Sequence, residues 1–300
     1  MQRSHLIWLA WFVPLLSHSA DAHAWGLYTH IYFAQWLVWS MPLLDPRLRQ
    51  AALHFPRLVM AGACLPDLAL MSPKFRDSHL WDRSQELLRC ARTDEERAIA
   101  VGYASHLFVD VIAHNHFVPA HEQMWLPDSL LTHIFGEWAM DAHLAPLADA
   151  TPYDLLRENH AVLAPLVARA FDCDAGCAAR ALRRLAAADR LLRKVRLPQF
   201  LYHSLRLLDR RVFHHFVYYV SQTQAAIAQI DGLFAGKRPL WEAEPSISGK
   251  TLLQQLRNNC VAQLHARHHA PIAFFAPAYS VKEMLAIKAP IAAAASTSLG

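Results

Sequence analysis

Apolar side chains recur at intervals of three and four residues along much of the chain, which is the spacing of one face of an α-helix. The spacing is clearest in four segments, each predicted to be helical: residues 28–39, 98–111, 130–144 and 201–227. Strand-like alternation bounded by turn signals is scarce. The pattern therefore predicts an all-α, multi-helix bundle. Its helices are expected to break at prolines near 42–46, 66, 73, 119–127 and 198.

The first 24 residues have the pattern of a secretory signal peptide. Arg3 precedes an eleven-residue apolar run, Leu6–Leu16, which is too short to span a bilayer as a helix. Ala22-His23-Ala24 then forms an A-x-A cleavage site. We expect cleavage after Ala24, a soluble mature chain that begins at Trp25, and export to the periplasm or out of the cell. An uncleaved N-terminal anchor is the alternative.

Composition narrows the class of protein. Of 300 residues, 54% are hydrophobic and 18% are charged, which excludes a disordered or collagen-like chain. The net charge of +4 falls short of that of a dedicated nucleic-acid binder. Histidine is abundant, with 19 residues, and imidazole is the commonest protein metal ligand. Five cysteines are too few for a disulfide scaffold, and Cys173 and Cys177 could either close a small loop or remain free thiols.

The main helical domain is expected to cover residues 25–240. Residues 236–250 have the composition of a linker, and a further helical segment follows. The last twelve residues, 289–300, are small and low in complexity, which is typical of a frayed tail. Residues 241–300 are therefore predicted to be a C-terminal helical extension with a flexible end.

Two His/carboxylate pairs have the spacing that places both members on one face of a helix. They are His106 with Asp110 and His133 with Glu137. A helix can offer such a pair to one metal ion without distorting its backbone. His116 follows Asp110 by six residues, and His114 competes with it as a candidate ligand.

Further candidate ligands lie closer to the N-terminus. After cleavage, the α-amino nitrogen and carbonyl oxygen of Trp25 can chelate a metal ion in a five-membered ring, and His30 follows five residues later. Asp67 lies in the stretch AGACLPD and His79 in FRDSHLWD. These residue types suit zinc.

The order of these residues resembles that of the trinuclear zinc phospholipases C. The stretches THIYFAQ and AGACLPD are also similar to the zinc-dependent phospholipase C domain of the glycosylphosphatidylinositol-specific phospholipases, and the S1/P1 nucleases share the ligand plan. The resemblance covers residues 25–143.

The resemblance implies a helical bundle around three zinc ions. It assigns Asp67, His79, His106 and Asp110 to one zinc ion, Trp25, His30 and Asp110 to a second, and His116, His133 and Glu137 to a third, with Asp110 bridging the first two. Cysteine is absent from this set, which argues against a purely structural zinc site.

The resemblance also implies an activity, that of an exported phospholipase C. Such an enzyme hydrolyses the glycerol–phosphate ester of a phospholipid at a membrane surface through a zinc-activated water, which Asp67 would orient or deprotonate. No obligate protein partner is inferred. The headgroup preference and a phospholipase D outcome remain open.

Two other functions remain as alternatives. The interval from Trp25 to His30 is closer to that of the S1/P1 nucleases, which cleave single-stranded nucleic acid or 3′-nucleotides. Glu137 favours the phospholipase, because the nucleases usually have aspartate there, in an HxxWD-type sequence. A non-catalytic zinc- and membrane-binding protein is the third hypothesis.

Some polar residues keep two interpretations. Asp141 and His143 suit either partners of metal ligands or ordinary surface positions. The basic stretch 178–211 suits either a solvated helix face or a surface that docks on anionic phospholipid.

Overall fold

The computed structural model describes residues 26–40, 43–124, 130–243 and 273–276, without the side chains of residues 123–124 and 130–133. These residues form helices and contain no strand, so the prediction of an all-α fold is confirmed. The predicted signal peptide, Trp25 and most of the predicted C-terminal extension lie outside the described residues.

The helices differ widely in length, and short 3₁₀ segments (η1, η2 and η4) and one π segment (η3) connect some of them. In chain order the elements are α2 (Leu27–Ser40), α3 (Pro46–His54), α4 (Pro56–Gly62), η1 (Pro66–Leu70), η2 (Pro73–His79), α5 (Trp81–Cys90), α6 (Asp94–Ile112), η3 (Ala113–Phe117), α7 (Val118–Met124), α8 (Leu130–Leu144), η4 (Ala145–Leu147), α9 (Pro152–Glu158), α10 (His160–Ala170), α11 (Ala175–Lys194), α12 (Leu197–Leu208), α13 (Val212–Ile227) and α14 (Asp231–Phe234).

Several helices begin at a side-chain cap followed by proline or acidic residues. Asp45 accepts hydrogen bonds from backbone N–H groups at the start of α3, and Thr151 does so at the start of α9, each just before a proline. Thr93 caps α6, and three acidic residues occupy the first turn of that helix. These groups satisfy the N–H donors that a helix start leaves without partners, and the acids complement its dipole.

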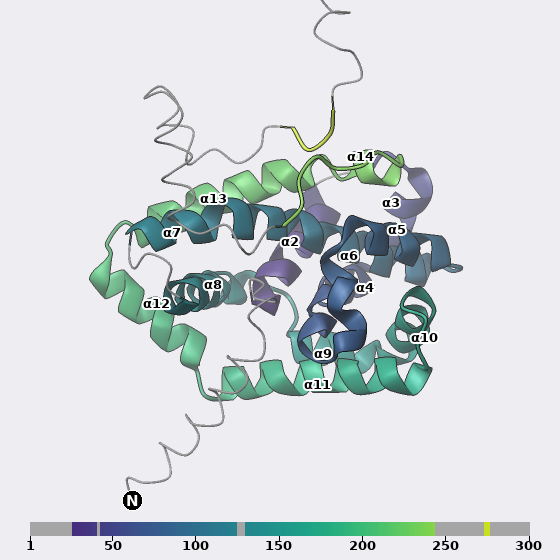
Figure 1. Cartoon of the computed structure of the whole chain (residues 1–300), viewed down its shortest axis with the longest axis horizontal. Coiled ribbons are helices and arrows are strands. Elements are labelled where there is room, and N and C mark those ends of the chain that lie inside the picture. The colour runs from purple at the N-terminus through teal and green to yellow at the C-terminus, as the bar shows by residue number, and fades with distance from the viewer. Residues whose placement is uncertain (1–25, 41–42, 125–129, 244–272, 277–300) are drawn as a thin grey trace, which may run out of the picture.

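Helix α6 is the centre of the molecule. Every residue from Ala98 to Ile112 is buried, and the helix packs against α2, α3, α4, α5 and α13. Helices α11 and α13 run along opposite edges, and α12 joins them (Figure 1). Because α6 is enclosed on all sides, any polar residue in its interior needs a partner from the helices around it.

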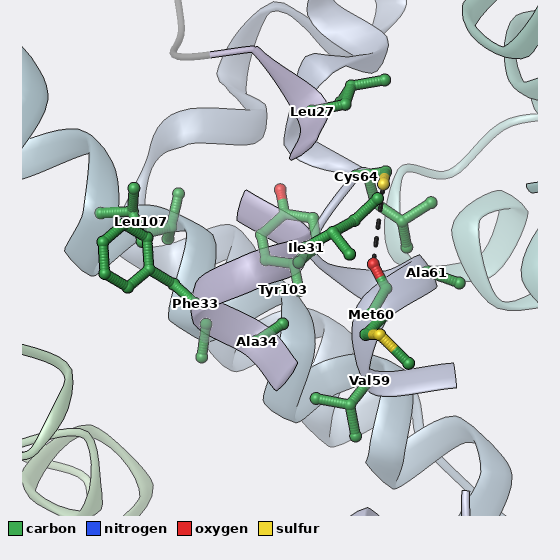
Figure 2. Packing of buried hydrophobic residues seen from close by; sticks show 14 of the residues in the cluster. Leu27, Ile31, Phe33, Ala34, Val59, Met60, Ala61, Cys64, Tyr103 and Leu107 are labelled. Carbon is green, nitrogen blue, oxygen red and sulfur yellow. Dashed lines mark hydrogen bonds between the residues drawn. The ribbon is translucent and has the colours of Figure 1, made fainter. Parts of the chain in front are cut away.

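Helices α4 and α6 approach each other very closely, because each has a glycine at the contact. A Cβ atom on Gly102 would lie 1.8 Å from the carbonyl oxygen of Val59, and one on Gly62 would lie 2.1 Å from that of Ile99. Figure 2 shows the apolar packing beside this contact, where Ile31 of α2 lies near Tyr103 of α6. The chain just after α4 is thereby held against α6.

The predicted helix over residues 201–227 is divided in the structure, which corrects the sequence analysis. Helix α12 ends at Leu208 and α13 begins at Val212. Between them Asp209 is extended, and its Oδ1 accepts a hydrogen bond from the backbone N of Arg211 at 2.8 Å. An aspartate side chain that bonds the backbone two residues later favours a turn over a continued helix. The apolar spacing continues through the break and does not reveal it.

Part of the predicted C-terminal extension packs on the main body. Phe274 is fully buried against Phe108 of α6, and its N–H donates to the side chain of Gln229 at 2.8 Å. Residues Cys173 and Cys177 are free thiols rather than a disulfide. None of the helices in the described part is long and apolar enough to cross a membrane.

Candidate metal centre

Five of the predicted ligands come together in the interior, from four different elements. His30 lies on α2, Asp67 on η1, His79 at the end of η2, and His106 and Asp110 on α6. The side chain of His79 is 24% exposed, and the other four residues of the group are buried. The group is therefore reached from solvent on the His79 side.

The distances within this group are short, and Asp110 is at its centre. Its Oδ2 lies 3.0 Å from Nε2 of His106 and 3.4 Å from Nε2 of His79, and its Oδ1 lies 3.6 Å from Nε2 of His30. The rings of His30 and His106 stack, with centroids 3.6 Å apart.

Two overlapping triads within the group have the geometry of a metal site. In each, one ligand atom from every residue lies within 4.8 Å of the other two, and the triads are His30, Asp67 and His106, and His79, His106 and Asp110. The shared residue is His106. Because only Nε2 of His106 faces the group, the two triads describe one continuous cluster and not two complete sites.

The orientation of His106 is set by a backbone carbonyl. Its Nδ1 lies 2.7 Å from the carbonyl oxygen of Ala63, the residue that follows α4. A proton on Nδ1 satisfies that carbonyl, so the neutral ring has only a lone pair on Nε2. That lone pair faces an oxygen of Asp110 at 3.0 Å. Two acceptors this close need a proton or a metal cation between them.

His79 is positioned through hydrogen bonds of its neighbours. The hydroxyl of Ser78 donates to the carbonyl oxygen of Pro66 at 2.5 Å, which ties η2 to η1. The hydroxyl of Tyr103, on α6, donates to the carbonyl oxygen of Ser78. These bonds hold His79 near Asp67 and Asp110. No motif in the sequence predicts these hydrogen bonds.

The electrostatics of the group show an excess of buried acceptors. Burial raises the pKa of Asp67 and of Asp110 to about 7, and it lowers the pKa of His79 to about 4. Neither oxygen of Asp110 accepts a hydrogen bond, nor does Oδ1 of Asp67. Buried oxygens of this kind are unfavourable unless a cation or proton compensates them.

The chain was compared with models of known protein families. One of these, the model of zinc-dependent phospholipase C, matches residues 29–181. The chain belongs to this family. Comparisons with curated proteins and with solved structures found no significant match.

Membership of the zinc-dependent phospholipase C family agrees with the chemistry of the cluster. Imidazole nitrogens and carboxylate oxygens are ligands that zinc accepts, and the buried oxygens that accept no hydrogen bond suit coordination of a cation. The residues present therefore fit zinc. The matched segment begins one residue before His30 and includes both α6 and α8.

The ligands predicted for a third ion are placed less completely. Glu137 is buried on α8, and the side chain of His133 lies outside the described residues. The imidazole that approaches Glu137 is that of His114, with 3.9 Å between Nδ1 and Oε1. His116 is partly buried, which lowers its pKa to about 4.

Both His114 and His116 lie on the π segment η3. There the N–H of Val118 donates to the carbonyl oxygen of Ala113, an i to i+5 bond. Such segments often occur at functional sites, because the extra residue per turn redirects the side chains. The six-residue step from Asp110 to His116 therefore does not follow α-helical geometry, which an i, i+3 or i, i+4 argument from sequence assumes.

Asp141 is a buried partner of the N-terminal segment, whereas His143 is not part of the cluster. Oδ1 of Asp141 accepts hydrogen bonds from the backbone N–H groups of Tyr28 and Thr29, and its other oxygen pairs with Arg193 of α11. His143 contacts the hydroxyl of Tyr202 at 3.0 Å, between α8 and α12.

Proposed function

We propose that this protein is an exported zinc-dependent phospholipase C that hydrolyses the ester between glycerol and phosphate, releasing diacylglycerol and a phosphorylated headgroup. The observation that carries the proposal is the pair of overlapping triads around His106, with carboxylate oxygens that lack hydrogen bonds. Family membership supports a phospholipid substrate over nucleic acid. The proposed export rests on the signal-peptide pattern that ends at Ala24.

The proposed ligands divide among three ions as the family resemblance implies. Asp67, His79, His106 and Asp110 would hold the first ion. Asp110, His30 and the amino terminus and carbonyl of Trp25 would hold the second, and His116, His133 and Glu137 would hold the third. When bound, zinc supplies the Lewis acidity that neutralises a phosphodiester and activates water.

The chain's own groups contribute orientation and proton transfer. Oδ1 of Asp67 accepts no hydrogen bond and lies 3.8 Å from Nε2 of His79, at the side of the cluster that reaches solvent. In the proposed mechanism Asp67 orients the attacking water and accepts its proton. Asp110, which is fully buried, lies against His30, His79 and His106 and helps to keep bulk water out of the cluster.

The test is phosphorus NMR on vesicles of mixed phospholipids incubated with the purified mature protein, with a chelated sample in parallel. Chelator-sensitive appearance of phosphomonoester headgroups is the expected result. Phosphatidic acid as product would replace the proposal with a phospholipase D. If the phosphorus spectrum does not change although the zinc content is verified, the phospholipase proposal is contradicted. The same protein would then be assayed for cleavage of single-stranded nucleic acid.

A variant of Asp67 tests its assigned role. Asp67→Asn keeps the shape of the side chain but removes the proton acceptor, so we expect a loss of at least about 100-fold in turnover. Zinc content and the circular dichroism spectrum report whether the fold and the metal survive. Asp77→Asn, at an exposed position on the same η2 segment as His79, is the matched control. Full activity of Asp67→Asn would contradict the proposal that Asp67 accepts the proton of the attacking water.

A further inference from the structure

A basic groove involves part of the predicted basic stretch 178–211. It has a volume of about 1190 Å³ and runs between α9 and α11, continuing past the end of α11. Five arginines and one lysine line it, and no aspartate or glutamate does. Helix α11 forms one edge of the molecule (Figure 1), and five of the basic residues that line the groove are exposed.

The positive charge in this groove is largely uncompensated. Five of these six residues make no ion pair with any carboxylate in the described part of the chain; they are Arg157, Arg183, Arg190, Lys194 and Arg196. The acids beside them in sequence are engaged elsewhere, since Glu158 pairs with Arg57 and Asp189 pairs with Arg193. A surface of this kind attracts anions.

The groove also has aromatic and apolar parts. The guanidinium groups of Arg190 and Arg157 lie 4.6 Å and 5.6 Å from the ring centroid of Tyr153. Leu191 lines the groove and is 44% exposed, and Val195, between two lining residues, is 50% exposed. Exposed aliphatic side chains beside cationic ones are typical of surfaces that lie in the headgroup region of a bilayer.

We infer that this groove docks the protein on an anionic phospholipid surface, with the cationic side chains contacting headgroup phosphates and Leu191 and Val195 entering the apolar boundary. The choice of lipid over nucleic acid rests on the proposed function. It also rests on the small number of rings for base stacking, since Tyr153 is the only Phe, Tyr or Trp among the described residues that line the groove. The groove is separate from the zinc ligands and would retain the enzyme at membranes that carry negative charge.

The test is sedimentation of zinc-loaded protein with vesicles of phosphatidylcholine alone or mixed with phosphatidylglycerol, at low and high salt. Binding is expected for the anionic vesicles only, and it should weaken with salt. Each cationic side chain near such a surface contributes about fivefold to partitioning, so Arg183→Glu/Lys194→Glu should weaken binding by well over about tenfold. Neither residue makes an ion pair or a side-chain hydrogen bond among the described residues.

A matched control reverses two charges elsewhere. Arg47 on α3 and Arg92 after α5 are exposed and make no ion pair among the described residues, so Arg47→Glu/Arg92→Glu changes the net charge equally. We expect this control to bind within about twofold of the parent. The neutral variant Arg183→Gln/Lys194→Gln serves if the double glutamate fails to fold.

Three results would overturn the inference. Equal loss in the control would mean that net charge, not the groove, determines binding, and undiminished binding of both groove variants would place the contact elsewhere. Groove-dependent binding of glycerol phosphate or of a single-stranded oligonucleotide, without vesicle binding, would identify a different ligand.

The inference and the proposed function fail separately. Vesicle binding without chelator-sensitive hydrolysis would support the docking surface and contradict the proposed phospholipase activity. Hydrolysis of a monomeric short-chain phospholipid without vesicle binding would support the phospholipase activity and contradict the docking surface.

Discussion

Asp141 acts as a helix cap for Tyr28, although the two residues are 113 positions apart in the sequence. Its Oδ1 lies 2.8 Å from the backbone N of Tyr28 and 3.1 Å from that of Thr29, at the start of α2. The chain before α2 offers only Gly26 at the capping position, and a Cβ there would lie 2.3 Å from Cγ of Asp141. A carboxylate from α8 thus satisfies donors at the start of the helix that carries His30.

Removing this contact is expected to destabilise the protein. Asp141→Ala leaves the N–H of Tyr28 without its acceptor, leaves that of Thr29 with only the carbonyl oxygen of Gly26, and leaves Arg193 with a single carboxylate. The free energy of unfolding should fall by about 3 kcal/mol. Urea denaturation of the metal-free protein measures the change. Asp149→Ala, at an exposed position near the end of η4, is the control and should change stability by less than about 0.5 kcal/mol. An equal effect of both would contradict the capping role.

The α4–α6 contact is expected to tolerate no side chain. Gly102→Ala places a Cβ on the carbonyl oxygen of Val59, so the helices must separate at a cost of about 3 kcal/mol. Separation also moves the carbonyl of Ala63 from His106, which should weaken zinc binding. Thermal unfolding and chelator competition measure the two effects. Gly176→Ala meets only side-chain atoms and is expected to have a smaller effect.

Asp110 is expected to affect the metal-free and zinc-bound proteins in opposite directions. Asp110→Asn removes a fully buried acid that lacks hydrogen bonds, so the metal-free variant should unfold at a temperature equal to or above that of the parent. The same change should weaken zinc binding by at least about 100-fold and abolish the stabilisation that zinc gives the parent. Calorimetric scans with and without chelator compare the two. A lower unfolding temperature of the metal-free variant would argue for a structural ion pair instead.

The pH dependence of stability should include a contribution from Asp189. Two buried carboxylates, Asp141 and Asp189, share the guanidinium of Arg193, and burial raises the pKa of Asp189 to about 6. The folded state keeps this proton after the unfolded state has released it near pH 4, so stability falls as the pH rises from about 4 to about 6. Relative to the parent, Asp189→Asn should gain on the order of 2 kcal/mol over that interval. A constant difference between pH 4 and pH 6.5 in urea denaturation would contradict this.

Much of the fold and of the site follows from local spacing. The intervals of three and four residues predicted helices that the structure contains as α2, α6 and α8, and the His106–Asp110 spacing placed two candidate ligands on one helix face. These predictions succeed because the rise and twist of an α-helix are properties of the backbone alone. The same argument missed the break at Asp209, where a side chain competes for backbone hydrogen bonds, and the π segment that carries His114 and His116.

The sequence by itself determined the helical class, the residue types of a zinc site and their family resemblance, because these depend on local geometry and on ligand chemistry. Tertiary structure decided which of those residues meet. Asp67 and His79 reach Asp110 because Gly62 and Gly102 let α4 and α6 pack backbone to backbone, and because Tyr103 bonds the chain beside His79. Contacts between residues distant in sequence depend on how closely helices can approach, and no spacing along one helix records that distance.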